Sequence, residues 1–287
     1  MTEIVGRAGV GKTQLAMQLC VVAARMGYGS IFIDTERKLS LQRLHEIARE
    51  RYKLNSSHEV LDSSTNSIGI PNFEYNLLSN GTENDIQNAH TRGRKKYSHP
   101  NSVMNNVTVH APVSTEELLS VIQELDEEII LRGESSSDVI MDNSASTQFP
   151  VKVIILDSIA APTKRDFGGG SAPQRVAAIF KIAQMLKRIA GQLKVAVVVI
   201  NQIDKMQGAS DFNSAKVALG TSWHHCVSTR VTMEHENDPH RDDALMNAMS
   251  NSESRVRTAT VAKSNLVGLS SMWFEVNLMG ICQVCVD

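Results

Sequence analysis

Short apolar runs alternate with amphipathic segments along most of this chain. The runs are apolar and β-branched and are too short for helices, as expected of strands buried in a parallel sheet; they cover residues 2–5, 30–34, 107–111, 151–157 and 195–201. Segments with apolar residues at helical spacing cover residues 14–26, 39–52, 115–132 and 173–194. Further strand-like stretches lie at 229–233, 257–262, 272–277 and 281–286. This order predicts an α/β fold with a mostly parallel central sheet and helices on both faces.

Three polar stretches break this alternation. Residues 54–106, 133–149 and 236–254 are rich in Ser, Asn and other polar residues, and no hydrophobic period is sustained in them. Such segments bury too little apolar surface to offset the entropy of ordering them. We therefore expect one core over residues 1–287, with three disordered inserts in its connections.

A glycine-rich loop lies between the first apolar run and the first helical segment. Gly6-Arg7-Ala8-Gly9-Val10-Gly11-Lys12-Thr13 matches the pattern G-x-x-x-x-G-K-[ST] at every fixed position. The glycines let backbone N–H groups point at phosphate oxygens, Lys12 reaches the β- and γ-phosphates, and the Thr13 hydroxyl binds Mg²⁺. The alternative is a chance glycine-rich turn, which three glycines, the GKT triplet and the flanking elements disfavour. The loop predicts a nucleoside triphosphate site.

Polar residues close three of the other apolar runs. Asp157 ends the run 151–157, where a carboxylate can hold Mg²⁺ opposite Thr13. Glu36 follows the run 30–34 and can orient and deprotonate an attacking water, although a solvated loop acid is an equally good reading of this residue alone. Gln202 follows the run 195–201, where its amide can sense a γ-phosphate. Together these side chains predict phosphoryl transfer to water.

Composition narrows the possible partners and compartments. The net charge of −2 gives no global attraction to nucleic acid, so any such contact must come from local patches. No apolar run is long enough to cross a membrane, and no signal peptide precedes the loop. Four cysteines in 287 residues suggest a reducing compartment. Cys282 and Cys285 form a lone C-x-x-C that serves either packing or a metal or redox role.

Several of these segments together resemble one family. GRAGVGKTQLAMQL, IFIDTERKLSLQRL, VKVIILDSIAA, VVVINQI and ALGTSWHHCVSTRV occur in the order found in the RecA/RadA family of recombinase ATPases. LQRLHEIARERY, LDEEIILRG and VAKSNL make the chain most similar to the eukaryotic recombinase paralogues, and to their B-type member in particular. Outside the inserts, the resemblance covers most of the chain.

The resemblance implies a role for each matched position. ATP would be bound by the loop and its successor (Gly6, Arg7, Ala8, Gly9, Val10, Gly11, Lys12, Thr13 and Gln14), with Arg43 against the adenine. Mg²⁺ would lie between Thr13 and Asp157, and Glu36, Lys12 and Gln202 would be the catalytic residues. DNA, single-stranded or branched, would be met by loops 163–173 and 204–218, which are Gly/Ser-rich with scattered Lys and Arg. Ordinary flexible loops are the alternative for both.

The chain also departs from that family. The N-terminal helical DNA-binding domain and the linker strand do not precede the loop, which begins at Gly6. We therefore expect a shortened form or an incomplete gene model, and assembly through the linker is in doubt. The cluster Arg92-Gly-Arg-Lys-Lys96 is either a nuclear-import or phosphate-binding patch or a solvated charge run.

Two functions remain after this comparison. The first is a nuclear DNA-dependent ATPase of homologous recombination and double-strand break repair, with slow turnover, that helps load the recombinase on single-stranded DNA. Its partners would be DNA, other recombinase paralogues and the recombinase, and no membrane. The second is an ATP-binding scaffold subunit of a paralogue complex. A small-molecule kinase is disfavoured because the segments after Asp157 lack an Arg-rich lid.

Overall fold

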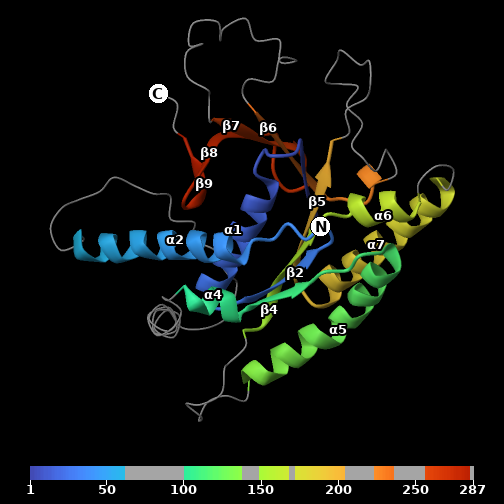
Figure 1. Ribbon diagram of the computed structural model, residues 1–287, viewed down its shortest axis with the longest axis horizontal. Coiled ribbons are helices and arrows are strands. Elements are labelled where there is room, and N and C mark those ends of the chain that lie inside the picture. The colour runs from blue at the N-terminus through green and yellow to red at the C-terminus, as the bar shows by residue number, and fades with distance from the viewer. Residues whose placement is uncertain (62–99, 138–148, 168–171, 204–222, 236–255, 285–287) are drawn as a thin grey trace, which may run out of the picture.

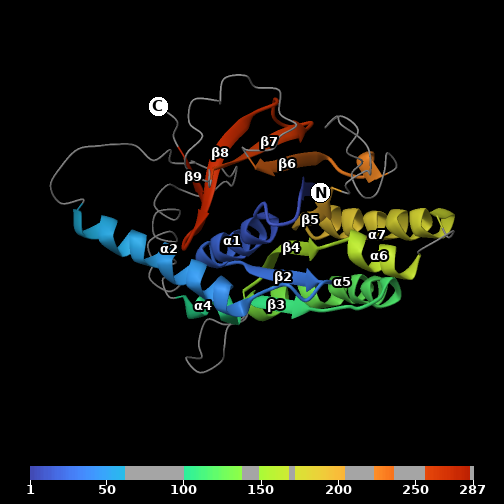
Figure 2. The ribbon, with the colours of Figure 1, turned by 45° about the horizontal axis from the view of Figure 1, so that its top comes forward.

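The computed structural model describes residues 1–61, 100–137, 149–167, 172–203, 223–235 and 256–284. Within them one sheet runs through the molecule, with helices on both of its faces (Figures 1 and 2). Its strands are β1 (Thr2–Gly6), β2 (Gly29–Asp34), β3 (Val107–His110), β4 (Val151–Asp157), β5 (Ala196–Gln202), β6 (Thr229–His235), β7 (Arg257–Lys263), β8 (Ser271–Asn277) and β9 (Gly280–Gln283). The helices are α1 (Lys12–Arg25), α2 (Leu41–Leu61), α4 (Asn101–Asn105), α5 (Thr115–Ser137), α6 (Ala160–Asp166) and α7 (Ala172–Gln192).

The strand order is β3-β2-β4-β5-β1-β6-β7-β8-β9. Pairing is parallel from β3 through β6 and antiparallel from β6 through β9. The phosphate-loop strand β1 is therefore central, and the strands that end in Asp34, Asp157 and Gln202 lie to one side of it. Since parallel strands present their carboxyl ends at the same edge, the polar residues after β2, β4 and β5 meet there. The expectation of a mostly parallel α/β sheet is confirmed.

The sheet has a hydrophobic core on each face. Strand residues that point to one side pack against α5, α6 and α7, as Ile154 and Leu156 do with Leu118 and Ile122. Residues that point to the other side pack against α1, α2 and α4. All-apolar strands form because both faces are covered, so neither set of side chains meets solvent.

Several boundaries differ from those expected. α2 continues to Leu61 and α4 covers Asn101–Asn105, so both ends of the expected insert 54–106 are helical. α5 likewise extends to Ser137, inside the expected insert 133–149. Polar residues can continue these helices because each helical turn is held by its own backbone hydrogen bonds. The last strand ends at Gln283 rather than Val286. The remaining parts of the inserts lie outside the described residues, so their disorder stays a prediction.

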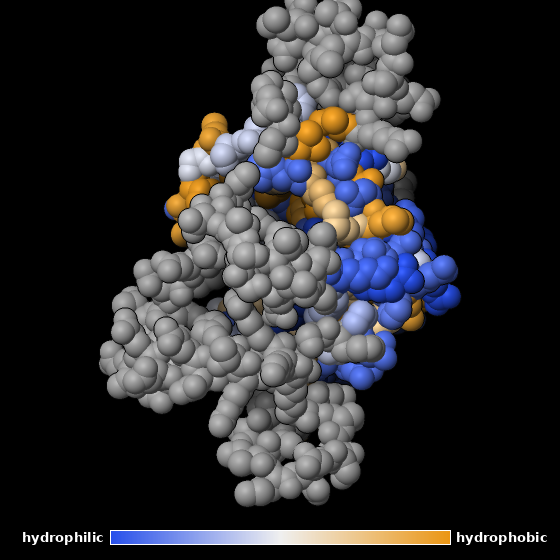
Figure 3. All heavy atoms as spheres, turned by 90° about the vertical axis from the view of Figure 1, so that its left-hand side faces the viewer, coloured by the Kyte–Doolittle hydropathy of each residue, from blue (hydrophilic) through white to orange (hydrophobic). Residues whose placement is uncertain are grey.

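The side of the molecule drawn in Figure 3 shows hydrophilic and hydrophobic side chains next to each other. On α2, Arg49 and Lys53 extend into solvent, with 51% and 62% of their side chains exposed. No helix in the described part of the chain is both long and apolar enough to cross a bilayer.

A pair of glycine variants tests the packing beside β2. A Cβ at Gly29 would lie 2.8 Å from the Phe149 carbonyl oxygen and would also meet the buried Arg132 guanidinium. We expect Gly29→Ala to lower the free energy of unfolding by about 2 kcal/mol, measured by urea denaturation. A Cβ at Gly191 in α7 would have no heavy atom of the described residues within 4 Å, and Gly191→Ala should raise stability by about 0.5 kcal/mol. Equal effects of the two variants would contradict this account.

Candidate active site

The phosphate loop connects the end of β1 to the start of α1. Gly9 and Gly11 adopt positive φ angles of 80° and 108°, which favour glycine, and Gly11 is the N-cap of α1. The Lys12 ammonium turns back over the loop and donates to the carbonyl oxygens of Gly6 and Arg7, both at 2.7 Å. Burial lowers the pKa of Lys12, while Asp157 and Glu36 oppose that shift. A cation inside a ring of backbone groups at a helix N-terminus is suited to phosphate.

Packing explains why the loop begins on a glycine. A Cβ at Gly6 would collide with the carbonyl oxygen of Met233 on β6 and would lie 2.9 Å from Val10. The loop can therefore curl over α1 only if this position has no side chain.

Thr13 and Asp157 face each other across the loop. The Thr13 hydroxyl donates to the Asp157 carboxylate at 2.6 Å, joining the start of α1 to the end of β4. A hydroxyl and a carboxylate are hard oxygen ligands of the kind Mg²⁺ prefers. Burial raises the pKa of Asp157 to about 6, and the neighbouring carboxylates of Glu36 and Asp34 add to this rise against the Thr13 hydrogen bond. A divalent cation at this point would relieve that accumulation of negative charge.

The raised pKa of Asp157 predicts a stability change that depends on pH. Above pH 6, the ionised Asp157 lowers the free energy of unfolding of the metal-free protein. This penalty is lost as the pH falls from the folded-state pKa of about 6 toward the ordinary pKa of 3.8, below which the carboxyl is protonated in both the folded and the unfolded protein. Asp157→Asn should therefore be more stable than the wild type at pH 7.5 by about 2 kcal/mol, with a smaller gain at pH 5.

Urea denaturation at the two pH values, without Mg²⁺ or nucleotide, measures this difference. A gain that is the same at both pH values would contradict the assignment. In the same variant the nucleotide affinity should depend less on Mg²⁺, because Thr13 remains as a ligand but the Asp157 carboxylate is lost.

The Glu36 carboxylate lies at the centre of three strand ends. One oxygen accepts hydrogen bonds from the Ser158 hydroxyl at 2.7 Å and from the Gln202 amide at 2.9 Å. The other oxygen pairs with Lys38. Burial would raise the pKa of Glu36, but the hydrogen bonds from Lys38 and Ser158 outweigh it and hold the pKa below its usual value. The structure thus brings Glu36, after β2, and Gln202, at the end of β5, into direct contact across the end of β4, which lies between these strands.

The turn that carries Glu36 is held by two polar residues that sequence reasoning missed. Asp34 accepts hydrogen bonds from the backbone N–H groups of Lys38 and Leu39, at 3.1 and 2.8 Å. Thr35 exchanges hydrogen bonds with the backbone of Ser158, which follows Asp157. The tripeptide Asp34-Thr35-Glu36 at a strand end was the available signal, and Lys38, two residues after Glu36, was missed as well.

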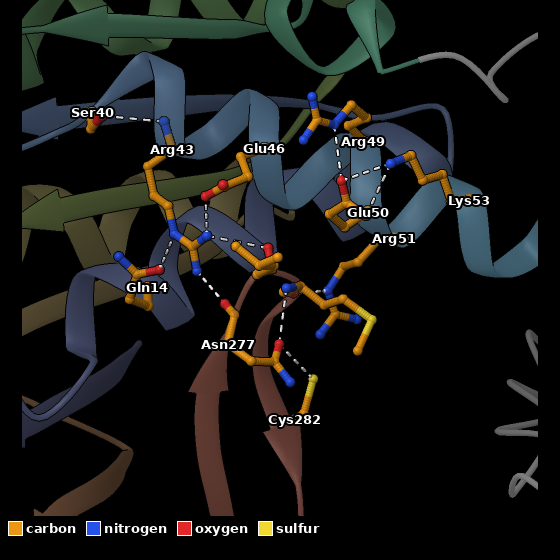
Figure 4. A network of polar contacts seen from close by, with 12 residues as sticks. Gln14, Ser40, Arg43, Glu46, Arg49, Glu50, Arg51, Lys53, Asn277 and Cys282 are labelled. Atoms are coloured by element: carbon orange, nitrogen blue, oxygen red, sulfur yellow. Dashed lines mark hydrogen bonds and ion pairs between the residues drawn. The ribbon is translucent and has the colours of Figure 1, made fainter. Parts of the chain in front are cut away.

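Arg43 lies beside Gln14, and its guanidinium is occupied by protein groups. Nε donates to the Gln14 side chain at 2.9 Å, and the terminal nitrogens reach Glu46 and the carbonyl oxygens of Asn277 and Leu278 (Figure 4). Arg43 is thus joined to the residue that follows the phosphate loop. Its contact with adenine stays a prediction.

The first of the two expected DNA loops is helical at both of its ends, and residues 168–171 between them lie outside the described residues. Thr163–Asp166 belongs to α6, and Thr163 is fully buried, with its hydroxyl bonded to the Ile159 carbonyl at 3.1 Å. The prediction of a loop over 163–173 is therefore wrong at both ends, because Pro162 is compatible with the first turn of α6, and Ala172 and Pro173 begin α7. In α6, Arg165 is exposed. The second loop, 204–218, and the cluster 92–96 lie outside the described residues.

A buried carboxylate on β1 was also missed. Glu3 is fully buried and accepts hydrogen bonds from Asn201 and Trp223, both at 2.8 Å, and from Arg230 at 2.5 Å. It fixes Asn201, the neighbour of Gln202, to the strand that leads into the loop. The signal was an acid inside the apolar run Thr-Glu-Ile-Val.

Three cysteines lie within the described residues, and none of them forms a disulfide there. Cys20 and Cys226 are buried, and the partly buried Cys282 donates to the Asn277 side chain at 3.4 Å. Burial raises the pKa of Cys20 to about 12. Cys285, the partner of Cys282 in the C-x-x-C, lies outside the described residues, so its role stays open.

Comparisons with known proteins agree with this arrangement. A family model described as Rad51 matches residues 94–263, more than half of the chain. The chain is 24% identical to the mouse DNA repair protein RAD51 homolog 2, covering 98% of this chain and 69% of that protein. It is 23% identical to the Arabidopsis thaliana DNA repair protein XRCC3 homolog, covering 99% and 86%. For the Dictyostelium discoideum DNA repair protein RAD51 homolog 3 the identity is 27%, covering 81% and 51%.

The chain therefore spans from about half to most of the length of these relatives. The similarity to recombinase paralogues, expected from the sequence motifs, is confirmed. The structure has the RecA-type fold, in which the phosphate loop follows the central strand β1 and acidic residues end β2 and β4. This chain belongs to the Rad51 family.

Proposed function

We propose that this protein is a DNA-dependent ATPase of homologous recombination and double-strand break repair in the nucleus. The observation that carries the proposal is the placement of Glu36, which contacts Gln202 and Ser158 beside the Thr13–Asp157 pair. Water activation and nucleotide binding would then use adjacent groups at one sheet edge. The names of the relatives, all DNA repair proteins, support the pathway.

In the proposed reaction each group has one task. Gly6, Gly9 and Gly11 let the loop wrap the phosphates, and Lys12 exchanges its two carbonyl acceptors for phosphate oxygens. Mg²⁺, held by Thr13 and Asp157, would neutralise charge on the β- and γ-phosphates. Glu36 would take a proton from the attacking water, and Gln202, bonded to it, would respond to the γ-phosphate.

Beside Glu36 lies a depression of about 360 Å³ that Arg37 and Arg165 also line. Two guanidinium groups there suit an anionic partner, and Arg165 belongs to the segment that the family resemblance assigns to DNA. We propose that single-stranded or branched DNA binds at this edge and also contacts the segment 204–218. Other recombinase paralogues and the recombinase itself are the proposed protein partners, and loading of the recombinase on single-stranded DNA is the proposed role.

Steady-state phosphate release with and without single-stranded DNA tests the proposal. We expect slow turnover that DNA stimulates severalfold and that rising salt concentration weakens, since the contacts are to phosphate. The same assay with Arg165→Ala should lose stimulation while turnover without DNA is kept. Nucleotide binding without any release of phosphate would overturn the enzymatic proposal.

One observation favours a second candidate, an ATP-binding scaffold subunit with little turnover. Both oxygens of Glu36 are occupied, and the pairing with Lys38 helps to lower its pKa, which makes it a weaker base. In that case ATP binding would stabilise a complex with other paralogues, and Glu36 variants would assemble normally. Phosphate release by the Glu36→Gln protein separates the two functions, because this variant loses turnover only if Glu36 is the catalytic base.

A further inference from the structure

The turn between β8 and β9 is fastened to α2 by two arginines (Figure 4). Arg51 donates from Nε to the Met279 carbonyl at 2.7 Å and from Nη2 to the Ile281 carbonyl at 2.8 Å. Arg43 donates to the carbonyl oxygens of Asn277 and Leu278. Four backbone acceptors of one short hairpin are thus satisfied by guanidinium groups from another element, which are strong, geometrically demanding donors.

The arginines belong to one stripe along α2. Arg43, Ile47 and Arg51 follow each other at four-residue spacing, so they share a helix face. Ile47 is fully buried, and a Cβ at Gly280 would lie 3.4 Å from it. The Gln18 side chain on α1 accepts a hydrogen bond from the Ile281 N–H at 2.7 Å. The hairpin therefore sits against both α1 and α2.

The same hairpin reaches the phosphate loop. A Cβ at Gly11 would lie 3.2 Å from Val276 and 3.7 Å from Phe274, both on β8. These side chains form the outer wall against which the loop turns into α1. A second connection runs through Arg43, whose Nε holds Gln14, the residue after Thr13. The hairpin thus bounds the loop directly and also through Arg43.

We propose that Arg51 is a positioning residue that sets nucleotide affinity by holding the β8–β9 hairpin against the phosphate loop. Arg51 lies about two helical turns beyond Arg43, roughly 12 Å along the axis, so it acts through the hairpin and not on the nucleotide. Without Arg51, Arg43 alone of the two arginines holds the hairpin on α2. The β8 side chains that face Gly11 and the carbonyl groups that bind Arg43 then become more mobile together. The inference rests on the proposed ATP binding.

Titration with a fluorescent ATP analogue in Mg²⁺ tests this role on the full chain. Arg51→Met, which keeps the apolar stem and removes the donors, should raise Kd about tenfold. Maximal turnover at saturating ATP should stay within about twofold of the wild-type value, because Glu36, Ser158 and Gln202 lie at the ends of β2, β4 and β5 and not on the β8–β9 hairpin. Arg51→Lys, which keeps one charged group, should have an intermediate Kd.

The matched control is Arg49→Met on the same helix. Arg49 pairs with its neighbour Glu50 at the surface, so the Kd of this variant should equal that of the wild type.

Hydrogen exchange of the amides at 279–283 gives an independent readout. Arg51→Met should speed exchange there, and Gly29→Ala, destabilised at a distant site, should leave Kd unchanged. Faster exchange with an unchanged Kd would overturn the positioning role while the proposed function stands. A Kd raised equally in Gly29→Ala would also overturn it, since general destabilisation would then be the cause. A wild-type chain that binds no nucleotide would reject both the proposed function and this inference.

Discussion

Replacing Glu36 with Gln is expected to lower maximal ATP turnover by about a hundredfold or more and to change nucleotide affinity little. Glutamine has nearly the same shape and can still accept hydrogen bonds from Ser158 and Gln202, but its amide cannot take a proton from water. Loss of the charge also frees Lys38, an exposed group with little effect on folding. Steady-state phosphate release at saturating ATP and single-stranded DNA measures turnover, and equilibrium titration measures affinity.

The control for this experiment is Glu50→Gln on α2. Glu50 pairs with Arg49 and Lys53 on α2 and makes none of the contacts of the strand-end groups, and the variant should turn over at the wild-type rate. If Glu36→Gln also retains more than about a tenth of that rate, Glu36 is not the base. The scaffold function would then be the better account.

Replacing Lys12 with Ala should raise the Kd for ATP by about a hundredfold or more. The ammonium lies inside the loop, where it can follow the β- and γ-phosphates, whereas Lys38, the lysine next to it in the site, pairs with Glu36. In the nucleotide-free protein it donates to the carbonyls of Gly6 and Arg7. Fluorescent nucleotide binding measures the loss.

Stability should change much less than affinity in this variant. Burial already lowers the pKa of Lys12, so removing the buried charge offsets part of the two lost hydrogen bonds. Lys53→Ala, at an exposed lysine of α2, is the matched control and should bind ATP as the wild type does. An unchanged affinity in Lys12→Ala would place the triphosphate elsewhere.

The phosphate loop and the strand-end acids could be identified from the sequence because their signals are local. Three glycines, Lys12 and Thr13 occur within eight consecutive positions, and Asp157 closes an apolar run. The contacts among them are not local: Ser158 and Gln202 meet Glu36 only after the parallel strands align. Placing all three at one sheet edge required the assumption of a parallel sheet, which the strand pairing supports.

Other features depend on packing that no local pattern encodes. For β7, β8 and β9 the sequence predicted strand-like stretches but not their antiparallel pairing. Their order and direction depend on which strands pair in the folded sheet. Residues 163–166 of α6 were predicted to be a loop because glycines follow them closely. The arginine stripe of α2 resembled an ordinary polar helix face, and its backbone acceptors lie more than two hundred residues away in the chain.

Both functions proposed for this Rad51-family chain require that it binds Mg²⁺ and ATP at the loop 6–13. Isothermal titration of ATP into the wild-type chain, with Mg²⁺ and again with EDTA, measures this binding. We predict saturable binding with one nucleotide per chain, weakened at least about tenfold by EDTA because Thr13 and Asp157 need the cation. Absence of binding at millimolar ATP, or binding that EDTA leaves unchanged, would contradict both functions.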